Sequence, residues 1–315
     1  MSFSRTTKDE LAHYDAPKDC CKLAEIAGFI RMCGTLELAG KGKFTIVMPA
    51  DTPAIARHFK KLVKDYFDID AEIELEEVKG LKNGTRYNLR IDPEHNSEAI
   101  LLEIGIIMVR GGKNTFADGI NESIIKSKCC RRSFLRGAFL ASGSITDPEK
   151  GYHFEITCTS ETLARDLKKL IRTFDDLNPK IRERKNKMSV YLKGGTQILD
   201  VLAIMQAHSA YLSYDNVMMI KDVRNRANRA SNCDSANVDR IIKASESQVD
   251  AIRKIEEMRG LDSLPENLRE VAELRLRYPE SSYDEIGQML NPPIGRSGIS
   301  KRFKKINEIA GNNED

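Results

Sequence analysis

The pattern of apolar and polar residues along the chain shows the same order of helix-like and strand-like segments twice. KLAEIAGFIRMCG at residues 22–34 is apolar with helical spacing, and SFLRGAFLASG at residues 133–143 repeats that pattern. Each run is followed by short segments of alternating polarity, which are typical of strands. Because Gly28 and Gly34 are separated from Gly137 and Gly143 by the same distance along the chain, we interpret the pattern as an internal duplication.

Both halves predict the order helix, strand, strand, helix, strand, strand, helix. Alternation within the strands predicts two four-stranded sheets, each with one face on helices and one face in water. After the first apolar helix, we expect strands at 35–38, 43–48, 71–78 and 85–91, with helices at 51–67 and 97–108. After the second, we expect strands at 143–146, 152–157, 180–185 and 188–194, with helices at 160–174 and 196–206.

The open face of the first sheet is predicted to be acidic. Ile73 and Leu75 should face the helices. Three glutamates then lie on the open side of the sheet: Glu72, Glu74 and Glu76. Arg86 and Arg90 add positive charge beside them. In the second half the corresponding strand is basic: Lys180, Arg182 and Arg184. Three interpretations remain open at this point, namely ordinary solvated charge, a surface for a protein partner, and a saddle for DNA, which the acidic strand would repel.

The C-terminal region predicts a helix-turn-helix. Ser282 can cap the short helix YDEIGQML, with Glu285 completing a capping box. Two prolines at 292–293 end that helix, and SGISKRFKKINEIA begins another, with Ser297 as its cap. Ile299, Phe303 and Ile306 share one apolar face of this predicted recognition helix, which spans residues 297–309. A further helix at 265–278 is expected to complete the core of the helix-turn-helix domain.

Basic residues surround that apolar stripe, and no acidic residue interrupts them between Arg296 and Lys305. Residues near the start of a recognition helix meet base edges, so we assign that role to Ser297, Ser300 and Lys301. The cations that follow are expected to hold phosphates: Arg302, Lys304 and Lys305.

Composition narrows the class of protein. The 315 residues are 41% hydrophobic with a net charge of +3, so they support folded domains. The first residues contain no secretory signal, and no run is long enough to span a membrane. The seven cysteines include no CxxC pair, so we expect reduced thiols, no metal, no cofactor and a cytoplasmic protein.

The repeated glycine helices resemble the LAGLIDADG motif of homing endonucleases, in IAGFIRMCG and LRGAFLASG. The penultimate position, which is acidic in the nucleases, is Cys33 in the first copy and Ser142 in the second. A thiol and a hydroxyl cannot hold the hard divalent cations of two-metal cleavage. We therefore expect the glycines to pack helices and the protein not to be an enzyme, with no catalytic residues. The competing hypothesis is an endonuclease that uses Asp147 or Glu37 instead.

The two degenerate LAGLIDADG units, the segment NRANRASNCDSAN and the terminal helix-turn-helix together resemble the WhiA family over nearly the whole chain. That family comprises bacterial regulators of sporulation and cell division. The resemblance implies a transcription regulator whose helix-turn-helix, similar to the promoter-reading region of sigma factors, makes most of the DNA contact. Four residues of the middle segment are expected to bind phosphates or to join the domains: Asn225, Arg226, Arg229 and Asn232.

The expected fold class is α+β, a duplicated αββαββα LAGLIDADG-like domain followed by an all-α helix-turn-helix domain. The expected domain ranges are 1–207, with repeats at about 20–110 and 130–207, then a helical linker at 208–264 and the helix-turn-helix at 265–315. The expected partners are double-stranded promoter DNA and another regulator or RNA polymerase. We expect the protein to be associated with the nucleoid and not to bind a membrane. The alternative function is a docking module that uses the acidic sheet face.

Overall fold

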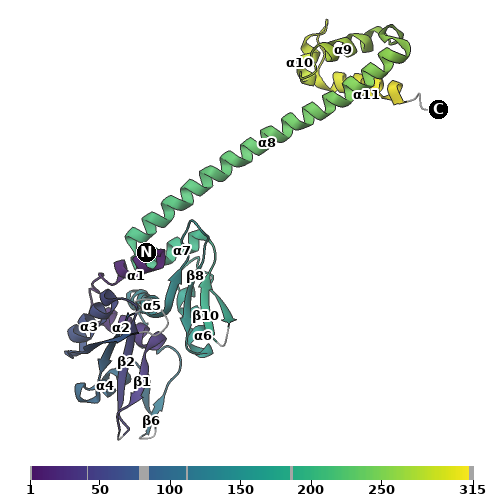
Figure 1. Ribbon diagram of the computed structural model, residues 1–315. Coiled ribbons are helices and arrows are strands. Elements are labelled where there is room, and N and C mark those ends of the chain that lie inside the picture. Colours follow the sequence, from purple (N-terminus) through teal and green to yellow (C-terminus); the bar gives the residue numbers. More distant parts are fainter. Residues whose placement is uncertain (1, 41, 78–84, 111–112, 185–186, 312–315) are drawn as a thin grey trace. The chain divides into compact units, whose positions relative to one another are not determined.

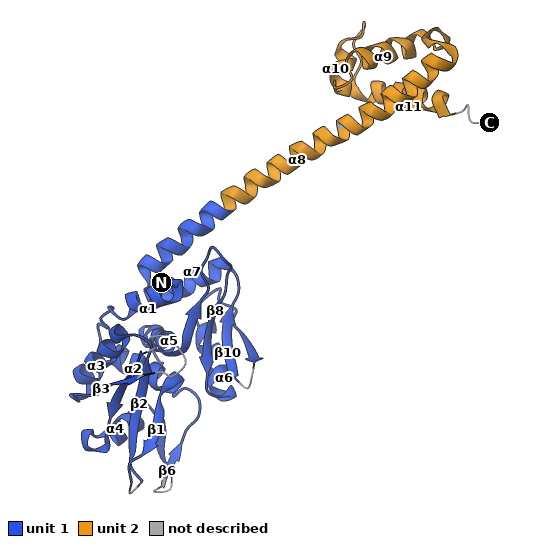
Figure 2. Ribbon diagram, in the orientation of Figure 1, with its two compact units in different colours: residues 1–221 blue, residues 222–315 orange. Residues whose placement is uncertain are grey.

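A computed structural model describes the chain except for residues 1, 41, 78–84, 111–112, 185–186 and 312–315. The described residues divide into two compact units, 1–221 and 222–315 (Figure 2). In the part of the chain that the structure describes, no helix is both long and apolar enough to cross a membrane.

The first repeat contains a four-stranded antiparallel sheet with strand order β1-β2-β4-β3 (Figure 1). A short hairpin of two further strands follows it, and one helix precedes the repeat. The elements are α1 (Phe3–Leu11), α2 (Asp19–Cys33), β1 (Thr35–Leu38), β2 (Phe44–Ala50), α3 (Pro53–Phe67), β3 (Glu72–Glu77), β4 (Thr85–Ile91), η1 (Pro93–His95), α4 (Ser97–Glu103), β5 (Ile107–Arg110) and β6 (Lys113–Phe116).

The second repeat has the same topology, with strand order β7-β8-β10-β9. Its elements are α5 (Lys128–Ser142), β7 (Gly143–Ile145), β8 (Phe154–Cys158), α6 (Glu161–Arg172), β9 (Lys180–Arg184), β10 (Lys187–Leu192) and α7 (Gly195–Met205). The matching strand orders confirm the predicted duplication and the αββαββα plan.

The motif helices α2 and α5 pack closely against each other in the centre of the first unit. A Cβ atom at Gly28 would overlap the carbonyl oxygen of Phe134, and one at Gly137 would overlap the carbonyl oxygen of Glu25. Only glycine lets the two backbones approach this far, because any side chain would meet main-chain atoms that cannot rotate away. The two repeats therefore share one hydrophobic core.

Two predictions in the first repeat were wrong. The helix expected at 97–108 ends at Glu103, because Gly105 takes a left-handed conformation (φ +71°) and the chain continues as strand β5. Leu75 lies on the same face of β3 as Ile73 but is not covered by a helix and is 70% exposed, whereas Ile73 packs against the core as expected. The reason is that β3 is the edge strand, while α3 packs on β2 and β4.

Helix α8 (His208–Arg259) is 52 residues long. At its start, the Glu10 carboxylate accepts hydrogen bonds from the backbone N–H groups of Ser209 and Ala210 (2.7 and 2.9 Å). Tyr214 is buried in the core of the first unit, while Ile252, near the other end, belongs to the core of the second. The segment 208–264, expected to be a helical linker, is one helix up to Arg259, and the domain boundaries stay predictions.

The second unit is all-helical. After α8 come η2 (Leu261–Ser263), α9 (Glu266–Arg277), α10 (Tyr283–Gln288) and α11 (Arg296–Gly311). The predicted capping box is present, since Ser282 Oγ accepts from Glu285 N–H and the Glu285 carboxylate accepts from Ser282 N–H. The end of α8 adds apolar residues to the core that sequence analysis had assigned to three helices.

Candidate nucleic-acid interface

The helix predicted to read DNA, α11, begins at Arg296 rather than Ser297. Ser297 is therefore not its cap; instead, the Gly295 carbonyl oxygen accepts from the N–H groups of Gly298 and Ile299 (2.9 and 3.2 Å). The predicted apolar stripe is buried completely or nearly so: Ile299, Phe303 and Ile306, at 0%, 1% and 0% exposure. These side chains fix which face of α11 points outward.

Five of the predicted DNA-binding residues of α11 are exposed without an intramolecular ion pair or hydrogen bond among the contacts described for their side chains. They are Arg296, Ser297, Ser300, Lys301 and Lys304. Two serines and two lysines lie within the first turns after Arg296, where a recognition helix meets base edges. Short polar and long cationic side chains on one open face can contact both bases and phosphates.

The two other predicted residues are partly engaged within the protein. The Arg302 guanidinium donates to the Asn267 carbonyl oxygen of α9 (3.1 Å), which links α11 to α9. Lys305 forms an exposed ion pair with Glu308 at 3.4 Å. Arg302 therefore has a structural contact that its position in the basic run did not reveal.

Arg275 organises the core behind this surface. It is 1% exposed and donates to Gln248 Oε1 of α8 (3.0 Å) and to the carbonyl oxygens of Pro279 and Ser281 (3.0 and 2.6 Å). Its guanidinium also stacks on the Phe303 ring of α11 at 5.0 Å. Burial lowers the pKa of Arg275, but the three oxygen acceptors keep the buried cation hydrogen-bonded. One side chain thus holds α8, the α9–α10 turn and α11 together.

A cleft of about 490 Å³ lies beside the start of α11. Arg296 lines it together with Asn237 and Arg240 of α8 and with Ser282 at the start of α10. Arg240 was not singled out from the sequence, because its place in a long polar helix gives no sign that α10 and α11 lie beside it. Two arginines near a helix N-terminus form a suitable setting for a phosphate group.

The C-terminal ends of the motif helices lack the acidic residues of a nuclease. Cys33 Sγ lies near the carbonyl oxygens of Phe29 and Pro49 (3.4 and 3.7 Å), and Ser142 Oγ donates to Thr157 O (2.7 Å). Burial raises the pKa of Cys33 above its ordinary value, and the nearby Asp51 raises it further, so the side chain is a neutral thiol. Neither group supplies the anionic carboxylate oxygens that usually hold a hard divalent cation.

Helix α1 occupies the same region. Its Lys8 is 7% exposed and forms an ion pair with Asp51 at 3.1 Å, and its Ser4 Oγ accepts from the N–H of Ile145 (3.3 Å). Asp51, whose charge acts on Cys33 at the end of α2, is thus already paired with an ammonium group. Glu37 pairs with Arg90 (3.1 Å), and Asp147 accepts from Glu149 N–H within its own turn, so these substitutes for the missing acids are engaged elsewhere.

Three family models match the chain in series. They are the WhiA N-terminal LAGLIDADG-like domain at residues 19–107, the WhiA LAGLIDADG-like domain at 131–224 and the WhiA C-terminal HTH domain at 227–310. The chain belongs to the WhiA family. This confirms the resemblance seen in the sequence, and with it the fold class of LAGLIDADG-like units followed by a helical helix-turn-helix domain.

Similar proteins span the full length of this WhiA-family chain. "Probable cell division protein WhiA" from Alkaliphilus metalliredigens is 42% identical over 98% of both chains. Its counterpart from Thermoanaerobacter pseudethanolicus is 44% identical over 98% of this chain and 97% of the relative. A crystal structure of full-length DUF199/WhiA from Thermatoga maritima covers 100% of both chains with 28% identity and a TM-score of 0.59.

The middle segment of this WhiA-family member is exposed. Four polar residues lie on the open surface of α8: Asn225, Arg226, Arg229 and Asn232. Their described contacts stay within the helix, from Arg229 Nε to the Asn225 carbonyl oxygen (3.2 Å) and from Arg226 to Asp222 (3.8 Å). Both expectations for these residues, contact with phosphates and joining of the domains, stay predictions.

The acidic sheet face is partly neutralised. Glu72, Glu74 and Glu76 are exposed on one side of β3 as predicted. Arg90, on the neighbouring strand, lies 3.5 Å from Glu74 and also pairs with Glu37 and Asp92. In the second repeat, Arg182 pairs with Glu155 at 3.0 Å. Glu74 on the first face and Arg182 on the second thus pair with neighbours of opposite charge, which favours solvated sheet charge over a dedicated docking surface.

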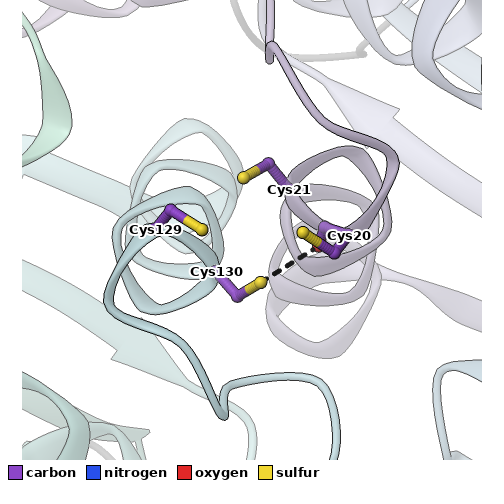
Figure 3. Close-up of side chains that lie close together, drawn as sticks. All are labelled: Cys20, Cys21, Cys129 and Cys130. Carbon is purple, nitrogen blue, oxygen red and sulfur yellow. Dashed lines mark hydrogen bonds between the residues drawn. The ribbon is translucent and has the colours of Figure 1, made fainter.

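The structure also brings together four cysteines that sequence analysis treated separately. Cys20 and Cys21 lie in the first turn of α2, and Cys129 and Cys130 in the first turn of α5 (Figure 3). Their sulfur atoms all lie within 4.8 Å of one another. The spacing of cysteines within one segment does not reveal this group, because each of the two helices supplies only two of the four thiols.

Proposed function

We propose that this protein is a DNA-binding transcription regulator connected with cell division, which reads promoter DNA through α11. The single observation that carries the proposal is the exposed polar face of α11, with Lys301 and Lys304 opposite a fully buried apolar stripe. A face held in place by a packed core and free of intramolecular partners is what major-groove reading requires. The relatives' name supplies the connection with cell division.

We further propose that the N-terminal repeats are a scaffold that does not cut DNA. The support is chemical: Cys33 and Ser142 stand where hard-cation ligands are needed, and Asp51 is paired with Lys8. Residues around the cleft beside α11, Arg240 and Arg296, would hold phosphates next to the base-reading face. The protein would then act at the nucleoid, with another regulator or RNA polymerase as a protein partner.

The test uses the full chain. Genomic DNA fragments are bound at graded salt concentrations, with Mg²⁺ or with a chelator, and the retained fragments are sequenced and checked for nicks. The wild type is compared with a charge-reversed double variant of α11, Lys301→Glu with Lys304→Glu. The control reverses two exposed lysines of the first unit, Lys169 and Lys193.

Selective retention by the wild type and the control, with loss of binding in the α11 variant and intact DNA throughout, is the expected result. Equal retention by wild type and α11 variant would place the interface elsewhere. Nicking that depends on Mg²⁺ would restore the endonuclease hypothesis, since cleavage needs the metal-bound carboxylates that we consider missing.

A further inference from the structure

The four-cysteine group has a geometry that suits one soft metal ion. In a tetrahedral zinc site with Zn–S bonds of about 2.3 Å, two sulfur ligands lie about 3.8 Å apart. The four thiols of Cys20, Cys21, Cys129 and Cys130 already lie within 4.8 Å of one another. To enter the first coordination sphere of a single ion, sulfur atoms at that upper limit have to move closer to each other by about 1 Å.

The group is built by the duplication. Each cysteine pair precedes its motif glycine at the same distance, Cys20 before Gly28 and Cys129 before Gly137. Since the glycines set α2 and α5 side by side, the first turns of both helices come together as well. Cys130 Sγ donates to the Cys20 carbonyl oxygen (3.4 Å), a contact that already links the two helix starts (Figure 3).

Two features of the surroundings favour thiolates, whereas burial acts in the opposite direction and raises the pKa of Cys21 to about 12 and that of Cys130. All four cysteines lie in the first turns of α2 and α5, where the N-terminal end of a helix carries partial positive charge. Ser127 Oγ lies 2.9 Å from Cys130 Sγ and 3.1 Å from Cys129 Sγ, where its hydroxyl can donate to sulfur.

Two of the four cysteines are buried, which distinguishes this group from a chance cluster of surface thiols. Cys21 is 2% and Cys130 5% exposed, while Cys20 is exposed and Cys129 half-buried. The inner two cysteines, one from each helix, would be shielded from solvent, and the outer two leave a side through which an ion can enter. Among the described residues, this is the one group of three or more His, Cys, Asp or Glu side chains placed to share a metal ion.

We propose that Cys20, Cys21, Cys129 and Cys130 form a structural tetrathiolate site for one zinc-class divalent ion, which pins the starts of the two motif helices together. Four thiolates and no other ligand make a closed coordination sphere, which is typical of structural sites and leaves no open position for catalysis. On binding, each thiol loses its proton to solvent, so affinity rises with pH. The site stabilises the pairing of the two repeats and reverses our expectation that the protein holds no metal.

The experiment uses the reduced, metal-free full chain and Co²⁺ as a probe. Titration is expected to give one cobalt per chain with the strong sulfur-to-cobalt charge-transfer absorption of a tetrahedral thiolate site, and Zn²⁺ should displace it. A double variant, Cys21→Ser with Cys130→Ser, removes one ligand from each helix and should abolish the absorption. The matched control, Cys233→Ser, changes an exposed cysteine of α8 and should bind like the wild type.

The wild-type titration keeps the test decisive if the double variant fails to fold. Zinc retained at one equivalent in protein purified without chelator, together with a rise in thermal midpoint on adding Zn²⁺ to the metal-free chain, supports the proposal. Absence of the cobalt absorption in reduced, folded wild type overturns it. So does recovery of the four cysteines as two disulfides without metal, or of iron with acid-labile sulfide, which would indicate a cluster instead of one ion.

Discussion

Glu25 and Arg136 form an ion pair at the crossing of the two motif helices, with 2.6 Å between Oε2 and Nη2. Both side chains are almost fully buried, at 0% and 1% exposure. His58 Nε2 lies 2.8 Å from the other carboxylate oxygen, so both oxygens of Glu25 have partners. This pair joins residues from the two repeats and lies within the otherwise largely apolar interface between the motif helices.

We expect Arg136→Met to destabilise the first unit strongly. The substitution keeps most of the volume but leaves the Glu25 carboxylate buried with only His58 beside it. Removing one partner of a buried pair costs about 3–5 kcal/mol. Hydrogen exchange of α2 and α5 amides in the full chain, measured at increasing urea, reports the loss for this unit alone.

The control for that measurement is Arg182→Met, which breaks the half-exposed pair with Glu155. Partly exposed pairs contribute about 0–1 kcal/mol, so this variant should stay close to the wild type. If Arg136→Met exchanges as slowly as Arg182→Met, the buried pair does not hold the repeats together.

The stability of the first unit should fall with acid through Glu25. Burial by itself raises the pKa of Glu25, but the Arg136 charge and the hydrogen bond with His58 outweigh it, and the pKa lies below its ordinary value. The stabilisation is therefore complete above the unfolded pKa of about 4.3 and is lost as the pH falls through the lower folded pKa.

Thermal midpoints of the full chain between neutral pH and pH ~3 check this expectation, with Glu25→Gln as the comparison. The variant is less stable at neutral pH, because Arg136 loses its partner, but it should lose less on acidification than the wild type. Parallel curves for the two proteins would mean that other carboxylates carry the acid sensitivity.

Gly137→Ala should separate the motif helices. The added methyl group would overlap the Glu25 carbonyl oxygen, a main-chain atom that can move only with its helix. Overpacking costs about 1–3 kcal/mol or more, whereas the higher helix propensity of alanine returns about 1 kcal/mol, so the net change is destabilising. Hydrogen exchange of α2 and α5 measures it.

Gly298→Ala is the matched control, because Gly298 is also helical but its added Cβ would meet the nearest side-chain atom at 3.4 Å, an ordinary contact. There the propensity gain should dominate, and α11 should become equally or more stable. An equal response of both glycines would show that close packing at the crossing is not what requires Gly137.

Within α11, Lys304→Ala and Lys301→Ala should affect DNA binding differently. Loss of a phosphate contact at Lys304 weakens binding about equally on all sequences and reduces the salt slope by about 1. Loss of a base contact at Lys301 relaxes the preferred sequence, with about 1–3 kcal/mol less discrimination at that position. Competition titrations on matched and mutated sites at several salt concentrations separate the two roles.

Lys169→Ala, in the first unit, serves as the charge-matched control and should leave both affinity and preference unchanged. A uniform loss on all sequences for Lys301→Ala would contradict its base-reading role, and Ser300 would then be the remaining candidate near the start of α11.

Much of the fold followed from local pattern. Alternation and helical spacing predicted both repeats, because a strand or an amphipathic helix records its buried face within a few neighbouring residues. The capping box at Ser282 and the buried stripe of α11 were predicted for the same reason. Leu75 shows the limit, since alternation identifies a face but not whether a helix covers the strand at that point.

The sequence by itself determined the duplicated α+β plan, the helix-turn-helix and the absence of acidic residues at the ends of the motif helices. Only the tertiary structure decided which distant side chains meet. Glu25 pairs with Arg136 across 111 positions, and Cys130 reaches Cys20 across 110. These contacts depend on how closely two helices pack, and that distance is set by Gly28 and Gly137 together with the whole core around them. No periodicity within a single segment carries that information.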